Sequence, residues 1–94
     1  MNNEPKTVVV FRKWKKSEGG GILALFPLEQ ERGYLCTSYE HIGQHGAADY
    51  VGCIMRTKSA KPEEYADLKK ELESEPYNYN LVVKKRRPNS RRVS

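Results

Sequence analysis

Residues 62–75 have the pattern of an amphipathic helix, and this segment limits what the chain can fold into more than any other feature. Pro62 suits the first helical position, where its missing N–H costs nothing, and a second proline at position 76 enforces the end. Three apolar residues recur at helical spacing: Tyr65, Leu68 and Leu72. This stripe has to be buried, so the remainder of the chain must provide an apolar surface on which it can pack.

That surface is predicted to be a β-sheet, because the other apolar segments are short and rich in β-branched and aromatic residues. The predicted strands cover residues 7–14, 22–26, 34–39, 50–57 and 79–84. Short turns between the early strands favour an antiparallel meander. We therefore expect an α+β fold. It would be a small two-layer sandwich with a mostly antiparallel sheet of about five strands, in the order β-β-β-β-α-β, and one helix packed on one face.

The segments between the strands are predicted from their glycines and prolines. Three consecutive glycines make residues 15–21 a turn, and Pro27 is expected to end the second strand before an acidic loop at 28–32. Residues 40–49 are predicted to form a long ordered loop, and Gly52 to mark a bulge in the strand that follows.

The first and last strands are expected to be neighbours, because pairing them would hide two apolar edges. The two faces of the first strand can be read from its alternation. One carries Val8, Val10, Arg12 and Trp14, and the other carries Thr7, Val9, Phe11 and Lys13. Both faces are apolar early and charged late, so we expect the strand to leave the core near Arg12.

The chain length of 94 residues leaves room for one hydrophobic core. We expect a disordered N-terminus at 1–6, a single domain at 7–85 and a basic disordered tail at 86–94. The net charge of +5 is concentrated at the end, where residues 84–94 hold six of the 17 bases and no acid. Residues 1–83 are left with 11 bases and 12 acids, and a nearly neutral body is weaker evidence for nucleic-acid binding than a uniformly basic fold.

The chain has the sequence features expected of a cytoplasmic protein. Its longest apolar run, residues 22–26, is far shorter than the roughly 18–20 residues that cross a bilayer, so no membrane partner is expected. The first residues lack the basic start and apolar stretch of a secretory signal. Cys36 and Cys53 fit a reducing compartment, where a thiol behaves as a small hydrophobe, and their spacing does not favour a disulfide.

Both histidines lie in the predicted loop, which raises the questions of metal binding and catalysis. The donors Cys36, His41, His45 and Cys53 have the spacing Cys-x4-His-x3-His-x7-Cys, which is not a standard zinc pattern, so we predict no metal and no cofactor. A histidine could act as a general base oriented by Asp49 or Glu40, or as the partner of a Cys36 nucleophile. A chain this short has little room for a deep pocket, so we predict no catalytic residues.

The loop nevertheless remains a candidate functional segment. Histidines in a glycine-rich loop often bond to the backbone and fix its shape, which is the simplest interpretation here. A small enzyme or metal-binding protein centred on this loop is the alternative. The residues of the candidate functional loop are Tyr39, His41, Gln44, His45 and Asp49.

Basic residues gather around Trp14 and again after residue 84, and neighbouring first and last strands would merge these clusters into one surface. Lysine and arginine side chains interleaved with Trp14, Tyr77 and Tyr79 would bind phosphates, while the aromatic rings would stack on nucleobases. The predicted nucleic-acid-binding residues are Arg12, Lys13, Trp14, Lys15, Lys16, Lys84, Lys85, Arg86 and Arg87. The alternative is that these charges only keep edge strands and the terminus soluble.

The segment from Ser38 to Asp49 reads Ser-Tyr-x-His-x-Gly-Gln-His-Gly-Ala-Ala-Asp. In this pattern the chain resembles a family of small uncharacterised proteins of bacteria and their mobile elements. The resemblance extends to Phe-Arg-Lys-Trp at 11–14, Ala-Leu-Phe-Pro at 24–27 and Glu-Tyr-Ala-Asp-Leu-Lys at 64–69, and so covers most of residues 8–85. It implies one compact domain and transfers no role to any residue.

The leading hypothesis is a small non-enzymatic binding module that contacts nucleic acid or another protein through its basic end and the histidine loop. A second hypothesis is the enzyme or metal protein described above. A third, which rests only on the resemblance, is an inhibitor that a mobile element makes against a host protein. An exposed edge strand would also allow a homodimer.

Overall fold

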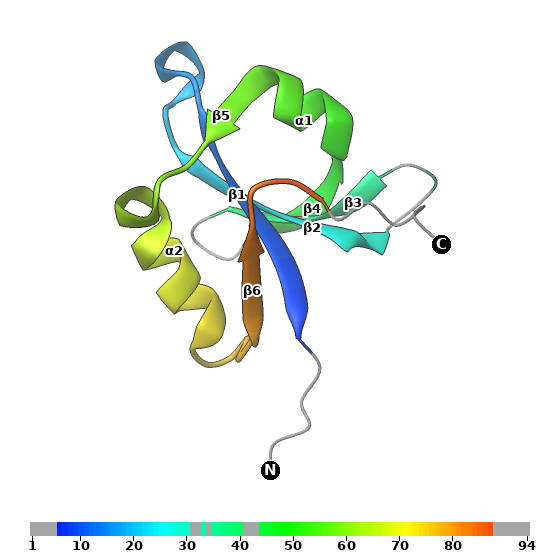
Figure 1. Ribbon diagram of the computed structural model, residues 1–94, viewed down its shortest axis with the longest axis vertical. Coiled ribbons are helices and arrows are strands. Elements are labelled where there is room, and N and C mark those ends of the chain that lie inside the picture. Colours follow the sequence, from blue (N-terminus) through cyan, green and yellow to red (C-terminus); the bar gives the residue numbers. More distant parts are fainter. Residues whose placement is uncertain (1–5, 31–32, 34, 41–43, 88–94) are drawn as a thin grey trace.

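The computed structural model describes residues 6–30, 33, 35–40 and 44–87. Within these residues, six strands form one mostly antiparallel sheet and two helices pack against it, which confirms the predicted α+β class (Figure 1). The predicted disordered ends lie outside the described residues, except for Lys6, Arg86 and Arg87. The strands are β1 (Thr7–Trp14), β2 (Ile22–Gln30), β3 (Leu35–Glu40), β4 (Gln44–Asp49), β5 (Thr57–Ser59) and β6 (Leu81–Lys84). The helices are α1 (Tyr50–Arg56) and α2 (Pro62–Glu73), and a 3-10 turn covers Lys16–Glu18.

The sheet has the order β4-β3-β2-β1-β5, and β6 also pairs with β1. Strands β1 to β3 form the predicted antiparallel meander, and β4, in a segment predicted to be a loop, extends it. On the side of β1 away from β2, β6 runs parallel to residues 7–10 and β5 runs antiparallel to residues 12–14. The expected pairing of the first and last strands is therefore confirmed, and β5 and β6 share one edge of β1 (Figure 1).

Helix α2 packs its apolar stripe on one face of the sheet, as predicted. Leu68 is buried and Leu72 is 0% exposed, in a cluster with residues of β1, β2 and β3. The ring of Tyr65 stacks on Phe11 with 4.4 Å between the ring centroids. Pro62 lies at the first turn, and the Glu64 carboxylate accepts a hydrogen bond from the backbone N–H of Lys61 at 2.9 Å, which caps the start of the helix.

Helix α1 covers the opposite face and corrects the prediction of a strand at 50–57. Tyr50, Cys53 and Ile54 follow the i, i+3, i+4 spacing and pack on the β1, β2 and β3 residues of a second core cluster. The prediction failed because a short apolar run fits the periods of a strand and of a buried helix equally well. Gly52 lies inside this helix and not in a bulge, and a Cβ atom there would sit 2.7 Å from Asp49 Oδ2.

Two further predictions about the strands are wrong. Pro27 does not end β2, because the register against β3 shifts between Phe26 and Gln30, and such an irregularity tolerates a residue without an N–H. Residues 44–49 are the strand β4 and not part of a loop, because they pair with β3 along their whole length. Positions 41–43 lie outside the described residues.

Candidate nucleic-acid interface

Arg12, predicted to mark where β1 leaves the core, is instead buried, with 8% of its surface exposed. Its Nε donates to Thr57 Oγ1 at 2.8 Å, and its Nη1 donates to Ser59 Oγ at 3.1 Å. Its Nη2 donates to two backbone carbonyl oxygens, those of Ile54 at 3.1 Å and Thr57 at 2.7 Å. Burial lowers the pKa of Arg12, yet a guanidinium remains charged in proteins. Arg12 therefore ties the end of α1 and the strand β5 to β1, and its charge is not presented to solvent.

Lys13 and Trp14 are half-buried, and both have partners. The Nζ of Lys13 lies 2.7 Å from Glu64 Oε2, and this hydrogen bond is the main reason why the pKa of Glu64 is lowered. The indole Nε1 of Trp14 donates to Glu40 Oε2 at 2.9 Å, and the guanidinium of Arg56 lies 5.6 Å from the centre of the Trp14 ring system. Of the predicted residues around Trp14, Lys15 and Lys16 are exposed in the turn after β1, and neither forms an ion pair with another described residue.

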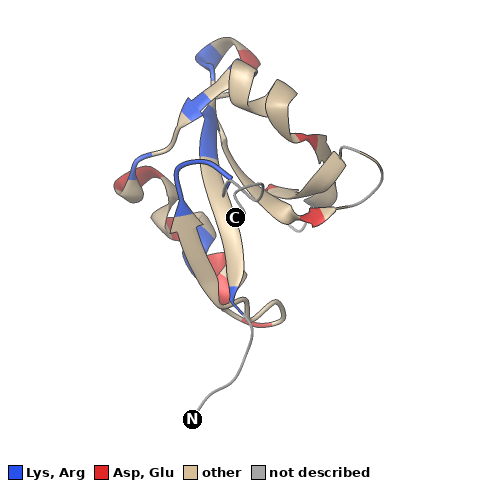
Figure 2. Ribbon diagram, turned by 45° about the vertical axis from the view of Figure 1, so that its right-hand side comes forward, with Lys and Arg blue, Asp and Glu red and all other residues tan. Residues whose placement is uncertain are grey.

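Exposed basic residues from separate parts of the chain line the edge that β5 and β6 form beside β1 (Figure 2). We call this surface the basic edge. Lys84 pairs with Val10 of β1, β5 pairs with residues 12–14, and the turn with Lys15 and Lys16 follows, so the charges succeed one another along β1. The residues of the basic edge are Lys15, Lys16, Lys58, Lys61, Lys84, Lys85, Arg86 and Arg87.

Lys58 and Lys61 are members of the basic edge that the sequence reading missed. They stand apart in the sequence from both basic clusters, and only the pairing of Lys58 with Lys13 of β1 places them between the two. Only a prediction of the short strand β5 beside β1 would have placed these two lysines at this edge. Acidic segments lie nearby at the β1–β2 turn and at the start of α2 (Figure 2).

The segment that follows β6 is attached to α1. The backbone N–H of Arg87 donates to the hydroxyl oxygen of Tyr50 at 2.7 Å, and its guanidinium lies 4.8 Å from the centre of the Tyr50 ring. This contact fixes where the basic edge ends on the α1 side of the sheet. Residues 88–94, which include two more arginines, lie outside the described residues.

The described residues of the candidate functional loop lie in different parts of the fold. Tyr39 is buried on the α2 face, where its hydroxyl donates to the Glu71 carboxylate. His45 is exposed, and its ring centroid lies 4.6 Å from that of Tyr39 and 5.4 Å from that of Tyr77. His41 lies outside the described residues, and Gln44 begins β4 opposite Glu40.

The tyrosines that were expected beside Trp14 belong to this aromatic cluster. Tyr79 stacks on Phe26 with 5.1 Å between ring centroids, and its hydroxyl lies 3.5 Å from His45 Nε2. Burial raises the pKa of Tyr79. The ring contacts place Tyr77 and Tyr79 on the α2 face of the sheet, away from the basic edge, so the basic edge gains no stacking surface from them.

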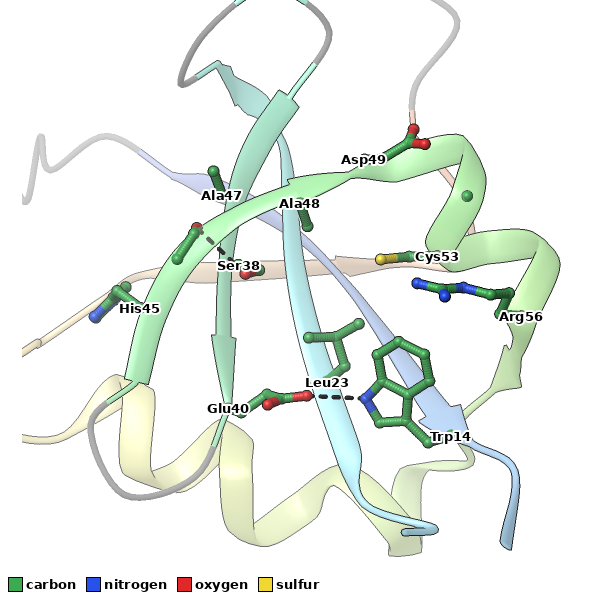
Figure 3. Close-up of a pocket in the computed structure, with 12 residues that line it drawn as sticks. Trp14, Leu23, Ser38, Glu40, His45, Ala47, Ala48, Asp49, Cys53 and Arg56 are labelled. Carbon is green, nitrogen blue, oxygen red and sulfur yellow. Dashed lines mark hydrogen bonds between the residues drawn. The ribbon is translucent and has the colours of Figure 1, made fainter. Parts of the chain in front are cut away.

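A cleft of about 570 Å³ lies between α1, β4 and the end of β1 (Figure 3). Trp14, Glu40, Arg56 and Cys53 line it together with small residues of β4. Asp49 ends β4 at its rim and makes no side-chain hydrogen bond to the backbone of α1.

The donors considered for zinc do not come together in the described part of the chain. Cys36 and Cys53 share the core cluster under α1, whereas the His45 ring packs on Tyr39 and Tyr77, which belong to the core on the opposite face of the sheet. Among the described residues, no three histidine, cysteine or acidic side chains form a group that could hold a metal ion. His41 lies outside those residues.

Both cysteine thiols are expected to react slowly in the folded protein. Burial raises the pKa of Cys36, and the neighbouring Cys53 raises it further; burial also raises the pKa of Cys53. Less thiolate then forms at pH 8, and the thiolate is the reactive species. We expect alkylation by iodoacetamide at pH 8 to be at least about tenfold slower in the folded protein than in denaturant. Equal rates in the two states would contradict this placement of the thiols.

Comparison with known proteins gives no match to a family model, to a curated protein or to a solved structure. The resemblance of residues 38–49 to small bacterial and mobile-element proteins stays a prediction. In the described part of the chain, neither helix has the length and apolar character needed to cross a membrane.

Proposed function

We propose that this chain is a small binding module that holds nucleic acid through phosphate contacts along the basic edge. The observation that supports the proposal is the succession of exposed charges along β1: Lys84 beside Val10, Lys58 beside Lys13, and Lys15 and Lys16 in the turn that follows. From Val10 to Trp14 the row follows β1 for four residue steps, which extend about 13 Å. This corresponds to the axial rise of about four base pairs of B-form DNA.

The basic side chains of the basic edge differ from Lys13 and Lys69, which form ion pairs. Lys13 is paired with Glu64 and Lys69 with Glu73, whereas the ion pairs found in the described part of the chain include no member of the basic edge. When exposed lysine and arginine side chains without an ion-pair partner contact phosphates, counterions are released. This release drives binding whatever the nucleotide sequence. The proposal therefore concerns affinity for the phosphate backbone and not recognition of a particular base sequence.

The experiment is a salt titration of binding with fluorescently labelled 20-nucleotide DNA and RNA, single- and double-stranded. We expect micromolar affinity at 50 mM salt and at least about a tenfold loss of affinity between 50 and 200 mM salt, because each phosphate contact adds to the salt dependence. Absence of binding at 50 mM salt to every one of these probes would reject the proposal.

Two charge-reversal double variants test whether nucleic acid binds at the basic edge. The double variant Lys58→Glu with Lys84→Glu changes the basic edge, and Lys69→Glu with Lys70→Glu makes the same change in net charge on α2. We expect the first variant to lose at least about tenfold in affinity and to show a smaller salt slope, whereas the second should stay within about threefold of the unchanged protein. Equal losses in the two variants would mean that overall charge, and not the basic edge, governs binding.

A further inference from the structure

Strand β4 ends the sheet, and its outer edge lacks the devices that usually protect an exposed strand. In the described part of the chain no strand pairs with β4 on the side away from β3. Its sequence, Gln-His-Gly-Ala-Ala-Asp, holds no lysine and no proline, and its register with β3 is continuous without a bulge. His45, Gly46 and Ala47 are exposed. The strand therefore offers a regular backbone edge to another strand.

One hydrogen bond shows which backbone groups face that edge. The hydroxyl of Ser38 on β3 donates to the carbonyl oxygen of Gly46 at 3.2 Å, so this carbonyl points toward β3. Successive residues of a strand direct their N–H and C=O groups to opposite sides. The corresponding groups of His45 and Ala47, and the N–H of Asp49, are therefore directed to the open edge.

We propose that this edge binds the same edge of a second copy of the chain, with β4 antiparallel to β4 and the twofold axis at Ala47. In this register Ala47 lies opposite Ala47 of the second copy, and the outward-facing groups of the two strands meet. His45 of each copy then lies opposite Asp49 of the other, on the same face of the joined sheet. Directly opposite side chains have Cβ atoms about 4.5–5.5 Å apart, which is within reach of a hydrogen bond between the imidazole and the carboxylate.

The strand is complementary to itself, which is why a second copy fits this edge. Twofold pairing brings a histidine near one end of β4 against a carboxylate at the other end, and it does so twice. The Asp49 carboxylate makes no capping hydrogen bond to α1 and is exposed, so it is available for this contact. Gly46 has no side chain and those of Ala47 and Ala48 are small, so the centre of the joined strands has no steric obstacle. The inference is independent of nucleic-acid binding, because β4 and the basic edge lie at opposite sides of the sheet.

The association is tested by sedimentation velocity of the full chain from micromolar to millimolar concentration. Pairing of a single six-residue strand buries little surface, so we expect a weak dimer that forms with rising concentration and reaches twice the monomer mass of 10.8 kDa. A monomer at every concentration would overturn the proposal, and so would assembly into species larger than a dimer.

The register is tested by exchanging charges. His45→Asp places two carboxylates opposite each other in each half of the dimer, and Asp49→Lys places a lysine opposite His45. Each variant alone is expected to weaken dimerisation at least about tenfold. An equimolar mixture should recover a dimer, because the carboxylate introduced in one variant then faces the lysine introduced in the other. Circular dichroism checks that both variants stay folded. Dimerisation of His45→Asp equal to that of the unchanged chain, or failure of the mixture to recover, would overturn the register.

The backbone contact has its own matched pair. Ala47→Pro removes an N–H that faces the open edge and leaves the pairing with β3 intact, whereas Ala47→Thr keeps that N–H. We expect Ala47→Pro to abolish the dimer and Ala47→Thr to retain it. Equal dimerisation of the two folded variants would mean that the contact does not use this edge.

Discussion

Replacement of Arg12 by alanine is expected to lower the free energy of unfolding by about 3 kcal/mol, because it leaves several hydrogen-bond acceptors in the interior without their donor. The guanidinium makes four hydrogen bonds to residues 54–59, and the carbonyl oxygens of Ile54 and Thr57 would lose this donor. The hydroxyl of Thr57, which donates to the Cys53 carbonyl at 2.7 Å, would lose the donor that orients it. The melting temperature should fall by at least about 12 °C.

Two controls separate the geometry of Arg12 from its charge. Arg12→Lys keeps the positive charge but cannot present a fork of donors to residues 54–59, so it should recover less than half of the loss. Lys16→Ala, an exposed change four positions further on, should stay within about 0.5 kcal/mol of the unchanged protein. Denaturant unfolding measures all three variants. Similar free energies of unfolding for Arg12→Ala and Lys16→Ala would contradict the burial of Arg12.

Leu72→Ala is expected to lower the free energy of unfolding by about 3 kcal/mol, because it opens a cavity between α2 and the sheet. Leu72 is 0% exposed and belongs to the core cluster with Phe26 and Tyr39. Neighbouring Glu71 accepts the hydroxyl of Tyr39, so movement of this turn of α2 would also disturb a polar contact of the core.

The matched control for Leu72 lies two residues earlier, on the solvent side of the same helix. Lys70→Ala keeps or improves helix propensity and removes an exposed side chain, so its effect should stay within about 0.5 kcal/mol. The comparison uses denaturant midpoints at equal slopes. A loss below about 1 kcal/mol for Leu72→Ala would contradict the packing of α2 on the sheet.

The predictions that the structure corrects concern segments whose conformation depends on contacts with distant parts of the chain. Residues 50–56 form a helix because Tyr50 and Cys53 find a buried site against β1, β2 and β3, whereas the local apolar pattern fits a strand equally well. Residues 44–49 are a strand because β3 provides hydrogen-bond partners for a segment of weak β propensity. Arg12 is interior because Thr57 and Ser59, more than 40 positions away, surround its guanidinium.

The candidate interface shows the same division. The exposed bases after β6 and in the turn after β1 were predicted from charge clusters alone, and their place on one edge depended on the predicted pairing of β1 with β6. Lys58 joined them only through β5, a strand of three residues that carries no recognisable pattern. Tyr77 and Tyr79 lie on the α2 face and not beside Trp14, because their rings pack on His45 and Phe26 respectively.

Local chemistry by itself determined the helix at 62–73 and the strand at 7–14 with its two faces, because proline geometry, apolar spacing and β-branched composition act within a few neighbouring residues. Tertiary structure alone decided the helix at 50–56, the burial of Arg12 and the assembly of the basic edge. The physical reason is that a short segment of mixed propensity takes the conformation in which distant strands bury its apolar side chains and satisfy its polar groups.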